Sequence, residues 1–137
     1  MIHVKAFAVV ATVLGCFVLT GCGGVPKSVV TGRITNKGEP IPVKPMVGKL
    51  KVWFILQDVP PPVDPKYANV KDDGSFDVTD SGNGIVAGKY KICIQWYDNF
   101  PQGPDKLKER FSEKNSKIFR KIPDDGVLNI DVSRPEG

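Results

Sequence analysis

Few residues in this 137-residue chain could serve as a nucleophile or as a base for proton transfer. The cysteines are Cys16, Cys22 and Cys93, and the only histidine is His3. A cysteine becomes reactive where a neighbouring base or positive charge favours its thiolate. Cys93 instead lies in an alternating apolar run, which predicts a buried and inert thiol. The two cysteines near the N-terminus need a separate interpretation.

The first 21 residues have the pattern of a bacterial export signal. Residues 1–5 are short and basic, and Ala6–Leu19 is an apolar run too short to span a bilayer comfortably. The following Leu19-Thr20-Gly21-Cys22 resembles the lipobox of bacterial lipoprotein precursors. The resemblance implies cleavage between Gly21 and Cys22 and acylation of Cys22, for example with palmitate. The alternative is an uncleaved anchor or an ordinary signal peptide with an unrelated cysteine.

This processing would remove most groups with catalytic potential. His3 and Cys16 leave with residues 1–21, and acylation occupies Cys22, so Cys93 remains as the only free thiol. A mature chain without histidine cannot form a Ser–His or Cys–His pair or a histidine-ligated metal site. One free thiol also excludes an internal disulfide. We therefore expect a protein that is not an enzyme and that has no metal and no cofactor.

Acylation would place the protein in the cell envelope. Each buried methylene contributes about 0.8 kcal/mol, and stable anchoring needs more than one acyl chain. A tether of residues 22–27 would hold the following domain within roughly 20 Å of the lipid. Gly23, rather than an aspartate, favours the outer membrane, facing the periplasm, under the common sorting rule. The net charge of +4, or +3 without Lys5, does not indicate nucleic-acid binding.

Residues 28–137 are expected to form one all-β domain with at most one short helix. Asp72-Asp73-Gly74 is a hairpin signal, and Asp105–Phe111 could form a helix capped by Asp105. The unbroken apolar run in Leu50–Gln57 predicts a central strand. The number and spacing of the strands predict a seven-stranded antiparallel Greek-key β-sandwich, an architecture that immunoglobulin-like domains share. The seven expected strands are Val29–Thr35, Leu50–Gln57, Tyr67–Lys71, Ser75–Thr79, Lys89–Tyr97, Ile118–Ile122 and Val127–Val132.

Three segments resemble the carboxypeptidase-regulatory-like, or transthyretin-like, domains. They are Val30–Ile41, with a glycine strand and a Gly-Glu-Pro turn, the hairpin Asp72–Phe76, and the strand entry Ile85–Ile92. Their order and spacing agree with the family, whereas the proline-rich insert between Leu56 and Tyr67 departs from it. The resemblance implies a β-sandwich that serves as a non-catalytic accessory or adhesive module. Hydrolases related to this family depend on histidines that the mature chain lacks.

A group of acids around the hairpin is a candidate cation site. Asp72, Asp73, Asp77 and Asp80 are close in sequence, and Ca²⁺ prefers oxygen ligands. Their spacing does not match an EF-hand loop. A solvated turn is the favoured interpretation.

Aromatic and basic residues supply the other candidate site. Trp53 and Trp96 lie in strand patterns and are expected in the core, whereas Tyr97 and Phe100 are expected to be exposed. The segment from Asp105 to Lys121 contains seven basic residues against three acids. Its members Lys117 and Lys121 are candidates for contact with anionic lipid or cell-wall polymer. A merely solvated connection is the alternative.

These observations predict a lipid-anchored envelope protein whose β-sandwich has a binding, scaffolding or structural role. The expected partners are the membrane, through acylated Cys22, and a cell-wall polymer or another envelope protein. One alternative is a carbohydrate- or cell-wall-binding module that uses Tyr97, Phe100, Lys117 and Lys121. The other is a small hydrolase that uses carboxylates.

Overall fold

The computed structural model of the protein describes residues 23–124 and 126–137. This part of the chain is all-β: it contains eleven strands and no helix. The strands are β1 (Lys27–Ser28), β2 (Val30–Asn36), β3 (Glu39–Pro40), β4 (Lys49–Leu56), β5 (Lys66–Tyr67), β6 (Asn69–Val70), β7 (Ser75–Val78), β8 (Ile85–Val86), β9 (Gly88–Tyr97), β10 (Ile118–Ile122) and β11 (Leu128–Asp131).

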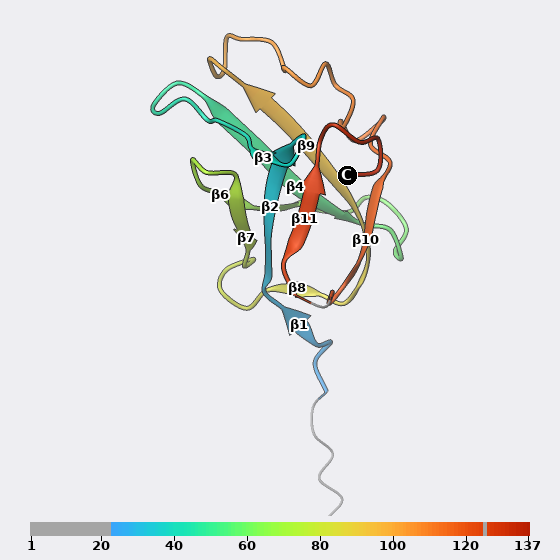
Figure 1. The fold of residues 1–137 in the computed structure, drawn as a ribbon. Helices are drawn as coiled ribbons and strands as arrows, with labels where there is room; N and C mark the ends of the chain where they lie inside the picture. Colours follow the sequence, from blue (N-terminus) through green and yellow to red (C-terminus); the bar gives the residue numbers. More distant parts are fainter. Residues whose placement is uncertain (1–22, 125) are drawn as a thin grey trace, which may run out of the picture.

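The strands form two main sheets and one small one (Figure 1). The four-stranded sheet has the order β10-β9-β4-β5. The five-stranded sheet has the order β11-β2-β7-β6, with β3 paired to β2. The short strands β1 and β8 pair with each other at the end of the molecule where the chain enters the domain. The long strand β4 lies inside its sheet, between β9 and β5, as its apolar sequence predicts.

The apolar core lies between the two main sheets. Their strands alternate, so that one face of each sheet contributes buried side chains to a single cluster. Phe54 of β4 is central to this contact: its ring lies 6.1 Å from the ring of Phe76 on β7 and 6.1 Å from that of Tyr90 on β9. Burial of such side chains supplies most of the free energy that holds the two sheets together.

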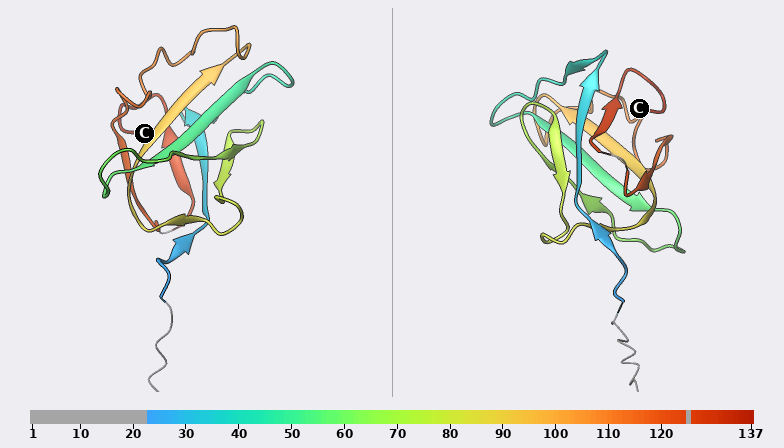
Figure 2. Two further views of the ribbon diagram at one scale, coloured as in Figure 1. Left: turned by 180° about the vertical axis from the view of Figure 1, so that it is seen from behind. Right: turned by 60° about the horizontal axis from the view of Figure 1, so that its bottom comes forward.

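The expected strand Tyr67–Lys71 is divided between the two sheets (Figure 2). Tyr67 pairs with Trp53 on β4, and the next residue, Ala68, donates its N–H to the carbonyl of Val52 at 2.8 Å. The chain then crosses, and Asn69 pairs with Asp77 on β7. The predicted hairpin between β6 and β7 is confirmed, with Gly74 at a φ of 79°. The division arises because β4 and β7, which lie in different sheets, both offer an open edge here.

The expectation of a wholly antiparallel fold is wrong at one pair, because β11 runs parallel to β2. The cause is the short connection from β10. Ile122, the last residue of β10, pairs with Gly88 at the start of β9, which is the same end of the molecule where β2 begins. β11 starts from this end, with Leu128 beside Gly32, and must therefore follow the direction of β2.

The helix expected over Asp105–Phe111 does not form. Lys108 and Glu109 have φ values of 51° and 59°, which no α-helix accommodates. The segment instead completes the edge of β9 beyond the first residue of β10, Ile118, which pairs with Ile92. Ile94 donates its N–H to the carbonyl of Phe111, and Lys106 donates to the carbonyl of Trp96. These bonds supply partners for backbone groups of β9 that β10 does not reach.

Gly32 on β2 provides a sensitive test of the packing within the five-stranded sheet, where it lies between β7 and β11. A Cβ atom at this position would overlap the ring of Phe76 and would lie 2.6 Å from the carbonyl oxygen of Leu128. We expect Gly32→Ala to lower the free energy of unfolding by about 1–3 kcal/mol, because the neighbouring strand cannot move away freely. Urea unfolding followed by circular dichroism measures the change.

Gly24→Ala is the matched control, because nothing lies within 4 Å of its position. Equal stability of the two alanine variants would contradict the packing described for Gly32.

Candidate functional site

Two of the sequence-predicted residues, Tyr97 and Phe100, lie together at the end of β9. Their rings meet edge to face at 5.3 Å between centroids. The Phe100 side chain is 37% exposed, whereas Tyr97 is half-buried. Burial raises the pKa of the Tyr97 phenol. Phe100 therefore offers an open ring, and Tyr97 supports it from the side.

Lysines from β4 stand against these rings. Lys49 pairs with Tyr97 in the register of the sheet, and its Nζ lies 4.9 Å from the centroid of Phe100. The Nζ of Lys51 lies 5.9 Å from Phe100 and 5.7 Å from Trp53. Tyr67, which is 59% exposed, stacks on Trp53 at 6.3 Å. We call Lys49, Lys51, Tyr67, Tyr97 and Phe100 the aromatic patch.

An open hollow of about 610 Å³ adjoins the aromatic patch, where β4 and β6 separate. Its lining includes Lys49, Lys51 and Tyr67 from the four-stranded sheet and Asn69 and Lys71 beyond the crossing. Trp53 and Trp96 are both buried, at 5% and 9% exposed, as expected. Trp96 belongs to the core between the sheets, whereas Trp53 lies on the outward side of β4, covered by Tyr67 and Glu113.

Lys121 lies at the other end of the same face. It pairs with Lys89, and Tyr97 lies eight positions after Lys89 on β9, which corresponds to roughly 26 Å along a strand. Phe119 is 39% exposed, and the Nζ atoms of Lys89 and Lys91 lie 5.1 Å and 5.8 Å from its ring. We call Lys89, Lys91, Phe119 and Lys121 the basic patch.

Lys117 belongs to neither patch. It directly precedes β10 and lines a separate shallow hollow of about 290 Å³ together with Lys108 and Arg110. The four predicted surface residues thus occupy three places, and only Tyr97 and Phe100 form a common surface.

The sequence-based search missed a separation of charge between the two main sheets. The strands of the four-stranded sheet contain seven basic residues and no acidic one. The strands of the five-stranded sheet contain one basic residue and three acidic ones. The basic residues of the first set are Lys49, Lys51, Lys66, Lys89, Lys91, Arg120 and Lys121; the charged residues of the second are Arg33, Glu39, Asp77 and Asp131.

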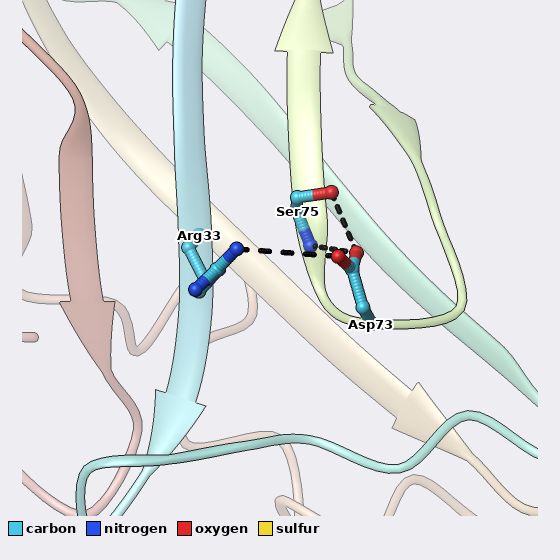
Figure 3. Close-up of polar contacts among 3 residues, drawn as sticks. All are labelled: Arg33, Asp73 and Ser75. Carbon is cyan, nitrogen blue, oxygen red and sulfur yellow. Dashed lines mark hydrogen bonds and ion pairs between the residues drawn. The ribbon is translucent and has the colours of Figure 1, made fainter.

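The acids considered for a cation site have separate structural roles. Asp73 closes the β6–β7 hairpin: its Oδ1 accepts hydrogen bonds from the N–H of Ser75 at 2.9 Å and from its hydroxyl at 2.6 Å (Figure 3). Arg33 of β2 reaches the other carboxylate oxygen at 4.0 Å (Figure 3). The hydrogen bonds from Ser75, assisted by Arg33 and Lys71, hold the pKa of Asp73 below its usual value.

The remaining acids of this group turn to other partners. Asp77 accepts a hydrogen bond from the Asn69 side chain at 3.0 Å, and Asp80 pairs with Lys66 at 3.1 Å. Asp72 is exposed. Within residues 23–124 and 126–137, no three His, Cys, Asp or Glu side chains gather in a way that could hold a metal ion. The geometry favours the interpretation of this segment as a solvated turn.

Cys93 is buried on the outward side of β9, beneath a polar cover. It pairs with Trp53, whose Nε1 donates to the Glu113 carboxylate at 3.1 Å, while Lys91 Nζ donates to the Glu113 carbonyl at 3.1 Å. Cys93 has no exposed surface. Burial, and then the charge of Glu113, raises the pKa of its thiol to about 12. The expected burial is confirmed.

A thiol reagent measures this protection in a chain that begins at Gly23 and so contains Cys93 alone. At about pH 8 the folded chain should react at least about a hundredfold more slowly than the urea-unfolded chain. Burial keeps the reagent away from the sulfur, and the raised pKa leaves little of the reactive thiolate. Rapid modification of the folded chain would contradict the described cover.

Asp131 joins the end of β11 to the turn between β2 and β3. Its carboxylate accepts backbone N–H groups from Ser133 at 2.9 Å, Lys37 at 3.0 Å and Gly38 at 2.8 Å. Hydrogen bonding from Ser133, and then from Gly38 and Lys37, holds the pKa of Asp131 well below its usual range. The carboxylate thus fixes the parallel pair β2–β11 at one end.

Asp131→Asn should lower the free energy of unfolding by about 1–2 kcal/mol near pH 7. The lowered folded-state pKa means that the carboxylate stabilises the fold fully above its unfolded pKa of about 4 and progressively less as the pH falls. The difference between wild type and variant, measured by urea unfolding, should therefore narrow below about pH 4. Asp64→Asn, in an exposed loop, is the control. If the difference in unfolding free energy between wild type and Asp131→Asn did not change with pH, the result would refute this role.

The predicted cleavage and acylation residues, Gly21 and Cys22, and the export signal of residues 1–21 lie outside the described residues. In residues 23–124 and 126–137, no helix is long and apolar enough to cross a membrane.

Comparison of the chain with protein-family models, with curated proteins and with solved structures gives no match.

Proposed function

We propose that the protein is a lipid-anchored component of the cell envelope, whose transthyretin-like β-sandwich holds a binding or scaffolding surface close to a membrane. Cleavage before Cys22 and acylation of this residue would supply the anchor, with the outer membrane, facing the periplasm, as the expected location. The domain acts without catalysis, and its partner is a cell-wall polymer, another envelope protein or the membrane itself.

The observation that carries this proposal is the short distance in sequence between the lipobox-like segment and the folded domain. Cys22 precedes β1 by only five residues, and β1 is already paired with β8. An anchor at Cys22 would therefore attach to a folded element through a segment of at most about 18 Å.

Two further observations support the proposed fold and the non-catalytic role. The two facing sheets and the Asp73–Gly74 hairpin are compatible with a Greek-key β-sandwich of the transthyretin-like type. The only thiol of the described residues is buried, and the acids at the hairpin already have structural partners. In the described part of the chain, these groups are therefore engaged in the fold, which supports a role in binding.

The carbohydrate-binding alternative has only part of its expected surface. Tyr97 and Phe100 lie together and adjoin the 610 Å³ hollow, but Lys121 lies at the far end of β9 and Lys117 in another place. A ligand of this kind would have to use the aromatic patch alone.

Metabolic labelling with palmitate in a bacterial host tests the anchor. Wild type should incorporate label and yield a shortened mature form, whereas Cys22→Ser should accumulate as an unlabelled precursor. Cys16→Ser is the matched control and should be labelled like wild type, because residue 16 would leave with the signal. Unchanged labelling of Cys22→Ser would refute the proposed anchor.

A further inference from the structure

The basic patch lies at the end of the domain where the chain enters. Lys27 of β1 pairs with Val86 of β8, and Lys89 of β9 follows three positions after Val86, at most about 10 Å along the chain. Lys121 pairs directly with Lys89. Figure 1 shows the same arrangement, with β1 and β8 beside the lower ends of β9 and β10. An anchor attached before β1 therefore faces the end of the sheet that carries the basic patch.

Two of the three lysines of this patch, Lys89 and Lys121, are exposed and available for a new partner. None of them forms an ion pair within residues 23–124 and 126–137. Lys89 and Lys91 flank the exposed ring of Phe119, and Lys91 also donates to the Glu113 carbonyl at 3.1 Å. Positive charge around an exposed apolar ring is the combination that suits the boundary between lipid headgroups and acyl chains.

A shallow hollow of about 300 Å³ opens within the patch. Lys89, Phe119 and Lys121 line it together with Asp58, Gly88 and Arg120. Asp58 is the acid at its rim, and its carboxylate is bound to the backbone N–H of Lys89 at 2.7 Å. Arg120 is held by the carbonyls of Glu136 and Gly137. Two lysines and an arginine thus surround one carboxylate, which leaves the hollow with a positive excess.

From these observations we infer that the basic patch contacts the anionic headgroups of the bilayer in which the protein is anchored. The inference rests on the proposed function, because the anchor would keep the basic patch close enough to the bilayer for charge attraction to act. Charge attraction decays over a Debye length of about 8 Å at physiological ionic strength, so only the end of the domain next to the anchor gains from it. The aromatic patch, roughly 26 Å further along the same face, is left free for other partners.

A defined tether tests the contact independently of biological acylation. The chain of residues 22–137, which contains every residue of the described core, is coupled through Cys22 to a maleimide lipid in nanodiscs; Cys93 is buried and does not compete. Gadolinium-bearing headgroups then broaden the amide resonances of nearby residues. In discs of one-third phosphatidylglycerol in phosphatidylcholine, the amides of Lys89, Phe119 and Lys121 should broaden, and those of Lys49 and Tyr97 should not.

Charge removal at the two ends of the sheet gives matched variants. Each lysine near an anionic surface strengthens the association roughly fivefold, so Lys89→Gln/Lys121→Gln should weaken the contact on the order of 25-fold and abolish the selective broadening. Lys49→Gln/Lys51→Gln removes the same charge from the same sheet and should leave the broadening unchanged. Discs of pure phosphatidylcholine should show none.

Several results would overturn the inference. Broadening that is the same in neutral discs, or in the Lys89→Gln/Lys121→Gln variant, would show that the tether alone brings the domain near the lipid. Broadening at Lys49 would place the wrong end of the sheet on the membrane. If the basic patch instead responds to a soluble anionic polysaccharide and shows no headgroup contact, its partner is a polymer. Because the tether is chemical, none of these results depends on whether Cys22 is acylated in cells.

Discussion

The structure depends on the burial of two sheet faces against each other, with Phe54 of the four-stranded sheet between Phe76 and Tyr90. Because this contact takes up the apolar side of the long strands, their outward sides lie outside the core, and in these described strands buried residues occur there only where Glu113 covers Trp53 and Cys93. Several lysines can therefore lie on the outer side of the four-stranded sheet without reducing the buried apolar surface. Their separation from the acids of the other sheet gives the domain two electrically different faces.

The strands that the sequence predicts most accurately are those with a complete alternating or apolar pattern. β4, β9 and β10 lie within a residue or two of the expected ranges, because side-chain pattern alone decides their faces. The pattern fails where backbone hydrogen bonds decide the outcome. Residues 66–70 pair first with the edge of β4 and then with the edge of β7. Residues 105–111 form hydrogen bonds along the edge of β9 instead of a helix. The direction of β11 depends on the end of the molecule at which β10 stops.

The same difference between side-chain pattern and backbone pairing explains which residues of the candidate site the sequence predicts. Alternation along one strand places Lys91 and Cys93 on the outward side of β9, and it separates Trp96 in the core from Tyr97 outside. The neighbours across the sheet depend on register, which brings Lys49 to Tyr97 and Lys89 to Lys121. The sequence of a single strand does not indicate which residues of a neighbouring strand pair with it. A search of the sequence therefore found the basic segment after residue 105 but missed the lysines of β4 and β9 that complete each patch.

The position of β2 decides how the domain would respond to a pull on its N-terminus. Tension entering through residues 23–26 first loads the two residue pairs between β1 and β8 and then reaches Val30. β2 is paired on both sides, parallel to β11 and antiparallel to β7, and Asp131 ties β11 to the turn at its far end. Force on the anchor would thus be shared between an inner strand of the five-stranded sheet and β8, which continues through Ala87 into β9 of the four-stranded sheet.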